Sequence, residues 1–221
     1  MSRLGIIDTH AHLDDNRFDS DRAAVMERLA RDMEAVITQG TTYESSVASV
    51  EMAEQYDFVF AAVGWHPEDL AGIKDESYIA ELEKLVREHE KVVAIGEIGL
   101  DYHYGTEEKE LQQKLFRAQL EIAEEAKMPV VIHERDSIAD CLDCVFDYDV
   151  TGTFHAFSGS KETAKKLLDR GWYISFGGTV TFKNARQPVE NAVYVPDDRI
   201  LTETDSPYLT PHPFRGERND S

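Results

Sequence analysis

The sequence predicts an α/β fold: a single (β/α)8 barrel of the TIM type whose final helix is missing. Apolar, β-branched runs recur eight times along the 221 residues, and helix-like segments separate them. The runs are spaced by the length of a strand plus a crossover helix, the repeating unit of a parallel sheet. Eight such units in a chain of this length favour one closed barrel over an open sheet. We therefore expect residues 1–221 to form one domain.

The expected strands are short runs rich in valine, isoleucine and phenylalanine, each bounded by polar or turn-forming residues. In chain order they are Gly5–His12, Ala35–Thr38, Val59–His66, Val92–Glu97, Val130–His133, Gly152–His155, Trp172–Phe176 and Ile200–Asp205.

Amphipathic segments predict the helices between these strands. The longest carries apolar residues at the 3–4 spacing of a buried helical stripe. Ser160 and Gly171 predict an N-cap and a C-terminal stop around a later helix. The helical segments include Asp21–Met33, Glu76–His89, Glu107–Ala126, Asp136–Phe146 and Lys161–Arg170, and the stripe is Leu111, Leu115, Ala118, Ile122 and Ala126.

The eighth unit lacks its helix. Three prolines between Pro207 and Pro213 exclude a helix interior directly after the last strand. The final helical unit is therefore expected to be absent or truncated after about residue 215. Either the chain is shortened, or another surface covers the first and eighth strands.

Composition limits the function classes. The net charge of −20 and the lack of a basic stripe disfavour binding of long duplex nucleic acid. No run is long and apolar enough for a membrane helix, and no signal peptide precedes the first strand, so we expect a cytoplasmic protein. No obligate protein partner is evident.

Cys141 and Cys144 could form a redox pair or half a zinc site, but they are expected to be reduced, packed thiols.

Six metal-ligating side chains fall where barrel active sites lie, at the carboxyl ends of strands. In the first strand, Ile6, Asp8, His10 and His12 are expected to share one face. In the fourth strand, Val93 and Ile95 are expected to share a face with Glu97. The same reasoning turns His133, His155 and Asp205 inward from the fifth, sixth and eighth strands.

A mixed set of imidazoles and carboxylates suits several divalent ions. Six ligands exceed what one catalytic metal uses while keeping an open position, so two adjacent ions are expected. Glu97 can bridge them around a shared water, and Asp205 is the natural general base for that water's proton.

Six motifs resemble those of the TatD family of metal-dependent deoxyribonucleases and follow one another in the same order. This family belongs to the amidohydrolase-like hydrolases. They are Ile-Asp-Thr-His-Ala-His-Leu at 7–13, Gly-Trp-His-Pro at 64–67, Gly-Glu-Ile-Gly-Leu-Asp-Tyr at 96–102, Val-Ile-His-Glu-Arg at 131–135, His-Ala-Phe-Ser-Gly at 155–159 and Glu-Thr-Asp-Ser-Pro at 203–207. One departure is Ala156, where relatives commonly carry Cys.

The resemblance implies cleavage of DNA phosphodiesters from a 3′ end, with nucleic acid ends or small phosphodiesters as substrates. It implies two divalent ions (Mg, Mn or Zn) and a substrate-facing role for His66. Arg135 shares the face of His133, and its guanidinium suits a phosphate. The implied metal ligands are His10, His12, Glu97, His133, His155 and Asp205.

Two other functions remain open. The same scaffold could cleave amides or carboxylic esters, although many such hydrolases use a strand-four lysine where this chain has Glu97, and Lys91 lies at the opposite end. An inactive metal-binding or interaction protein is the other alternative. Asp8 could orient a ligand or simply form buried hydrogen bonds, and Glu203 could orient a ligand. No role is assigned to His89, His103 or His212.

Overall fold

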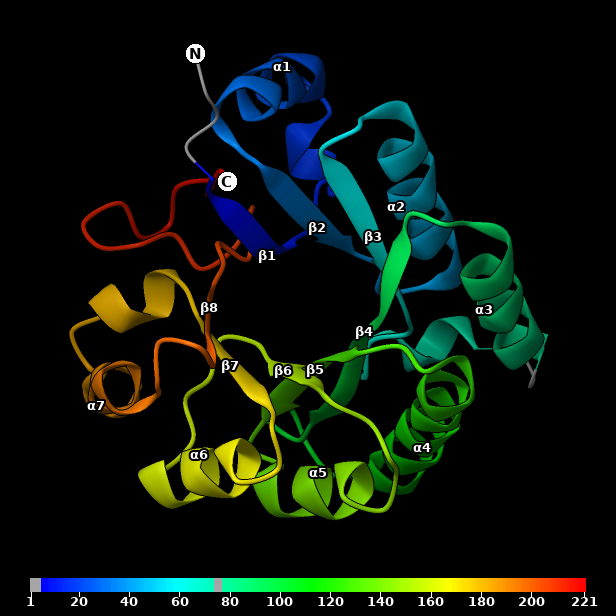
Figure 1. The fold of residues 1–221 in the computed structure, drawn as a ribbon, viewed down its shortest axis with the longest axis vertical. Coiled ribbons are helices and arrows are strands. Elements are labelled where there is room, and N and C mark those ends of the chain that lie inside the picture. The colour runs from blue at the N-terminus through cyan, green and yellow to red at the C-terminus, as the bar shows by residue number, and fades with distance from the viewer. Residues whose placement is uncertain (1–4, 74–76) are drawn as a thin grey trace.

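The computed structural model describes residues 5–73 and 77–221 and contains one parallel sheet of eight strands in the order β1 to β8. Figure 1 shows the strands as a ring with the helices outside it. The predicted barrel is confirmed, and the strand boundaries agree within a few residues. The strands are β1 Ile7–Ala11, β2 Ala35–Gln39, β3 Val59–Val63, β4 Val92–Asp101, β5 Val130–Arg135, β6 Gly152–Phe154, β7 Tyr173–Phe176 and β8 Ile200–Thr202.

Seven α-helices and three short 3-10 helices connect the strands of the described chain. Ser160 caps α6 as predicted, because its hydroxyl accepts the Thr163 N–H. The α-helices are α1 Arg22–Asp32, α2 Tyr43–Gln55, α3 Ser77–Glu88, α4 Lys109–Ala126, α5 Ile138–Val145, α6 Lys161–Leu168 and α7 Arg186–Tyr194; the 3-10 helices are η1 Asn16–Phe18, η2 Leu70–Gly72 and η3 Gly178–Thr181. The expected first residue of α3, Glu76, lies outside the described residues. None of the described helices is both long enough and apolar enough to span a membrane.

One detail of α4 was predicted wrongly. Leu111 is 44% exposed and Ala126 is also exposed, so the buried stripe does not run through them. The buried face is rotated and contains two glutamines that hydrogen-bond to backbone at the tops of β3 and β4. Apolar spacing alone could not find it, because polar residues complete the face. Its members are Gln112, Leu115, Phe116, Gln119, Leu120, Ile122 and Ala123.

The segment after β8 joins the last strand of the barrel to the first. No α-helix follows β8 among the described residues, as expected, and the chain runs instead along β1 (Figure 1). The His12 N–H donates to the Ser206 carbonyl at 2.7 Å, and the Asp205 N–H donates to the His10 carbonyl at 2.8 Å. Asp21 pairs with both terminal nitrogens of Arg218 at 2.6 and 2.7 Å. These contacts join the two edge strands.

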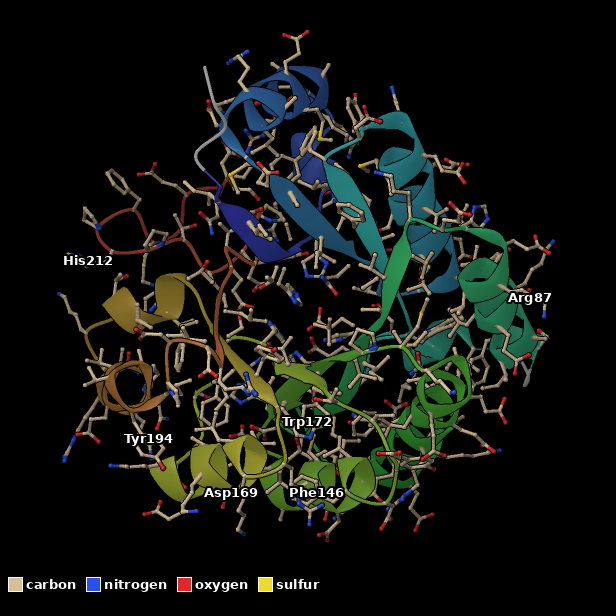
Figure 2. The ribbon with its side chains drawn as sticks, viewed as in Figure 1. Arg87, Phe146, Asp169, Trp172, Tyr194 and His212 are labelled. Carbon is tan, nitrogen blue, oxygen red and sulfur yellow. The ribbon has the colours of Figure 1, made fainter. Side chains whose placement is uncertain are left out.

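Two apolar cores lie on opposite sides of the sheet. The larger one fills the space between strands and helices, and both cysteines are free and buried within it, as expected. Figure 2 labels one of its largest members, Trp172, whose ring packs edge-on against Phe154. The smaller core is inside the barrel and consists of Ala62, Ala94 and Val131 with Ile37 against them. The barrel interior above these small residues is left to polar side chains.

Candidate metal centre

A cavity of about 650 Å³ opens at the carboxyl ends of the strands, and polar side chains line it. Glu97 lies at its base, 3% exposed. One carboxylate oxygen, Oε2, lies 3.3 Å from His10 Nε2 and 3.4 Å from His12 Nε2. The Asp205 oxygen Oδ1 faces the same two nitrogens at 3.4 and 3.3 Å. Two imidazoles and two carboxylates thus converge on one point.

The other Glu97 oxygen, Oε1, faces a second group of histidines. It lies 2.8 Å from His155 Nε2, 3.0 Å from His133 Nδ1 and 3.6 Å from His66 Nε2. Glu97 therefore stands between two sets of nitrogen atoms and presents one oxygen to each. A carboxylate in this position has the geometry of a bridge between two cations.

The convergent nitrogen atoms fit divalent cations. His10 Nε2 and His12 Nε2 are 3.3 Å apart, and so are His133 Nδ1 and His155 Nε2. A neutral imidazole carries one ring proton and cannot satisfy several nitrogens and oxygens at once. An ion accepts all these lone pairs together, and the donor set suits Zn or Mn as well as harder ions.

The pKa values of the clustered side chains are shifted by burial and by the charges of their neighbours. Burial would raise the pKa of Glu97, but the surrounding histidines, His155 and His10 foremost, hold it well below its ordinary value. Burial would lower the pKa of His12, but the hydrogen bond to Asp205 and the charge of Glu97 raise it to about 9. The pKa of His66 is lowered by burial and by the charge of His133. In the protein without metal, His12 is therefore protonated at neutral pH.

Strand alternation accounts for the inward side chains on β5, β6 and β8. On β1 and β4 the alternation is broken, and His10, His12 and Glu97 face inward as predicted but without sharing a face with Asp8 or Ile95. The β4–β5 register shifts between Ile95 and Ile98. Ile95 belongs to the larger core, between the strands and the helices, so its side chain points out of the barrel. Glu97 reaches the interior because one extra residue resets the alternation, not because it shares a face with Ile95. Such irregularities redirect side chains beside active sites.

The β1–β2 register also shifts, between Asp8 and Ala11. Asp8 pairs with Val36, which belongs to the larger core outside the barrel, so the Asp8 side chain does not share the face of His10 and His12. Its carboxylate accepts the Thr204 N–H at 3.0 Å and the Thr204 hydroxyl at 2.6 Å. Asp8 is thus a buried hydrogen-bond partner that joins β1 to the segment after β8, which answers the question left open by the sequence.

Asp101, at the end of β4, was missed by the sequence reasoning. Its Oδ2 lies 2.9 Å from His133 Nε2, the ring nitrogen that faces away from Glu97. Gln112 of α4 holds the Asp101 backbone through two hydrogen bonds. The alternation Glu97, Gly99, Asp101 above the register shift would have found it. Gly99 has a φ of +149°, and a Cβ there would collide with the His133 carbonyl oxygen.

The remaining predicted residues lie around the mouth. His66 is 7% exposed and packs edge-on against the His133 ring. Arg135 is exposed at the rim, where its guanidinium lies 5.4 Å from the centre of the Tyr104 ring. Among the described residues that line the cavity, Arg135 is the one lysine or arginine.

The histidines without an assigned role lie elsewhere. His103 pairs with Asp136 at 2.8 Å, and His89 pairs with Glu54 at 2.6 Å. His212 is on the outlying loop after β8 (Figure 2). None of the three contacts Glu97 in the described structure.

Comparison with known proteins gives consistent results. Residues 7–221 match the model of the family described as TatD related DNase. The chain is 44% identical to an uncharacterized metal-dependent hydrolase, YabD, of Bacillus subtilis, over 97% of this chain and 85% of that protein. It is 41% identical to an uncharacterized metal-dependent hydrolase, YcfH, of Escherichia coli K12, over 97% and 82%. The crystal structure of YjjV, a TatD homologue from E. coli K12, superposes with a TM-score of 0.91 at 31% identity, covering 97% of this chain and 84% of YjjV.

Proposed function

The chain belongs to the TatD-related family of metal-dependent hydrolases, and from this premise we propose that it cleaves phosphodiester bonds at the 3′ end of single-stranded DNA. The observation that carries the proposal is the placement of Glu97, with one oxygen toward His10 and His12 and the other toward His133 and His155. A bridging carboxylate between two histidine pairs is the arrangement of a two-ion hydrolytic centre.

Two divalent ions (Mg, Mn or Zn) are proposed to bind here. His10, His12 and Asp205 would hold one ion, His133 and His155 the other, and Glu97 both. Such a pair lowers the pKa of a water between the ions and stabilises the attacking and leaving oxygens of the phosphodiester.

Asp205 and Glu97 are the proposed catalytic residues. The hydrogen bond from His12 and the charge of His10 outweigh the effect of burial and lower the pKa of Asp205, so it remains ionised and able to accept a proton. Its backbone is fixed by the hydrogen bond to the His10 carbonyl. Glu97 orients both histidine pairs.

Substrate binding is proposed to use His66 and Arg135. His66 lies at the edge of the histidine cluster and lines the cavity, and Arg135 supplies a guanidinium at its rim. Asp14, Asp15, Glu68 and Asp69 also line the mouth. These carboxylates repel the extended phosphate backbone of a long duplex and favour a short end or a small phosphodiester.

The test is incubation with a 3′-labelled single strand and Mg, Mn or Zn, with EDTA as the metal-free control. We expect release of the labelled 3′-terminal nucleotide with at least one metal and none in EDTA. Asp205→Asn should abolish cleavage while the far-ultraviolet circular dichroism is unchanged, and the exposed Asp198→Asn is the matched control that should retain it. Near-normal turnover by Asp205→Asn would exclude Asp205 as the base.

The same incubation decides between the alternatives. A small chromogenic phosphodiester and a carboxylic ester are tested with the same metals. Hydrolysis of the carboxylic ester alone would assign the centre to the other amidohydrolase-like reactions. No hydrolysis of any substrate with any metal would favour a metal-binding protein without activity.

A further inference from the structure

Beneath the proposed two-ion centre lies a set of buried polar atoms without partners. The second ring nitrogens of His10 and His155, both Nδ1, have no hydrogen-bond partner, and neither has Oε2 of Glu203. All three residues are at least nine-tenths buried. One ring nitrogen of each histidine and one oxygen of Glu203 lie within 4.8 Å of one another.

The two rings are stacked almost in parallel. Their centroids are 4.0 Å apart and their planes differ by 10°. Both present Nε2 to Glu97, one to each of its oxygens. A neutral histidine that offers Nε2 to a metal carries its proton on Nδ1, so each ring has one N–H to donate on the side away from the metals.

Glu203 is placed to accept those protons. Its side chain is fully buried, and its Oε1 accepts the Ala156 N–H at 2.6 Å and lies 3.7 Å from His155 Nδ1. Its Oε2 is left as an acceptor without a donor, while the two rings hold donors without an acceptor. The separation of 3.7 Å exceeds hydrogen-bond distance, so a direct bond requires a small rotation of the Glu203 carboxylate.

We propose that Glu203 is a positioning residue shared by the two metal sites, accepting the Nδ1 protons of both His10 and His155. One carboxylate thereby fixes the tautomer and ring orientation of one histidine from each ion's ligand set. Asp101 orients His133 alone, through the contact between its Oδ2 and His133 Nε2. The inference rests on the two-ion centre of the proposed function but not on the identity of the substrate.

The experiment compares Glu203→Gln with Asp101→Asn as the matched control. In Glu203→Gln the amide oxygen can still accept the Ala156 N–H, but the NH₂ group then stands toward two N–H donors. Metal affinity is measured by titrating the apo protein with Zn or Mn in the presence of a competing chelator. Loss of a hydrogen-bond partner of a metal ligand typically weakens affinity by about 10- to 100-fold. We expect Glu203→Gln to weaken both sites by this factor and Asp101→Asn to weaken one.

Wild-type affinity at either site in Glu203→Gln would overturn the proposal. A second measurement does not depend on the variant: in the NMR spectrum of the loaded wild-type protein, the Nδ1 protons of His10 and His155 should both be protected from exchange. Rapid exchange of either proton would also overturn it. If both sites are weakened but no DNA is cleaved by the wild type, the proposed function fails and the role of Glu203 stands. If the wild type cleaves DNA and Glu203→Gln binds both ions normally, only the role of Glu203 fails.

Discussion

Metal-free protein should lose stability as the pH rises, because His12 is stabilised in its protonated form. Its pKa is raised from 6.5 to about 9 in the folded state, by the hydrogen bond to Asp205 and the charge of Glu97 acting against burial. A raised pKa stabilises the fold fully below 6.5, and that contribution is lost as the pH passes 9. Each pKa unit is worth about 1.36 kcal/mol, so the loss attributable to His12 is about 3 kcal/mol.

The assay is urea unfolding of EDTA-treated protein from about pH 6 to about pH 10, followed by circular dichroism. His12→Gln removes the titrating group and serves as the reference, so the difference between the two curves isolates His12 from its neighbours. The free energy of unfolding of the wild type should fall towards that of the variant as the pH rises. Parallel curves over the whole range would refute the assignment of the buried charge to His12. Metal-loaded protein should not show this loss, because an ion replaces the proton.

Three further predictions follow from the site and the strands that carry it. Metal affinity, measured by chelator competition, should rise with pH up to about 9, since the His12 proton competes with the ion; an affinity that is constant from pH 6.5 upward would contradict this. Arg135→Ala should lower kcat/KM on a single strand by about tenfold, mostly through KM, because a charge-assisted hydrogen bond is worth roughly 1.5–3 kcal/mol and this one is exposed; an unchanged KM would remove Arg135 from substrate binding. Gly99→Ala should destabilise the fold by more than Gly171→Ala, because a Cβ at Gly99 meets the His133 carbonyl whereas nothing lies within 4 Å of one at Gly171; equal losses in thermal melts would count against this close approach of β4 and β5.

The sequence was sufficient for the barrel because strand and helix signals alternate with the period of the fold. Inward residues could be identified wherever the two-residue period is unbroken, as for His133 on β5. The period fails on β1 and β4, where register shifts place Asp8 outside and bring Glu97 inside. A bulge of this kind depends on pairing between strands distant in sequence, so no local pattern shows it. Asp101 was missed for a different reason: the expected strand ended at Glu97, whereas β4 continues to Asp101.

The buried face of α4 was also misjudged through a nonlocal effect. Gln112 and Gln119 are buried because their amides bond to the backbone of Asp101 and Trp65 at the ends of β4 and β3. A prediction from apolar spacing expects only apolar residues on the buried face. It therefore assigns the buried face to another side of the helix, away from Gln112 and Gln119. These polar positions are where the helix supports the carboxyl ends of strands that carry the site.

The geometry of Asp205 depends on the segment that follows β8. Asp205 has a φ of +57°, a left-handed conformation that costs a residue other than glycine about 1–3 kcal/mol unless its surroundings enforce it. Several contacts do so: its N–H is held by the His10 carbonyl, and Asp8 holds the backbone and hydroxyl of Thr204 beside it. The buried Asn219 amide then donates to the carbonyls of Thr204 and Tyr208, each at 2.8 Å. The loop after β8 and the buried Asp8 therefore act together on one residue, and they fix the carboxylate that faces His10 and His12 opposite Glu97.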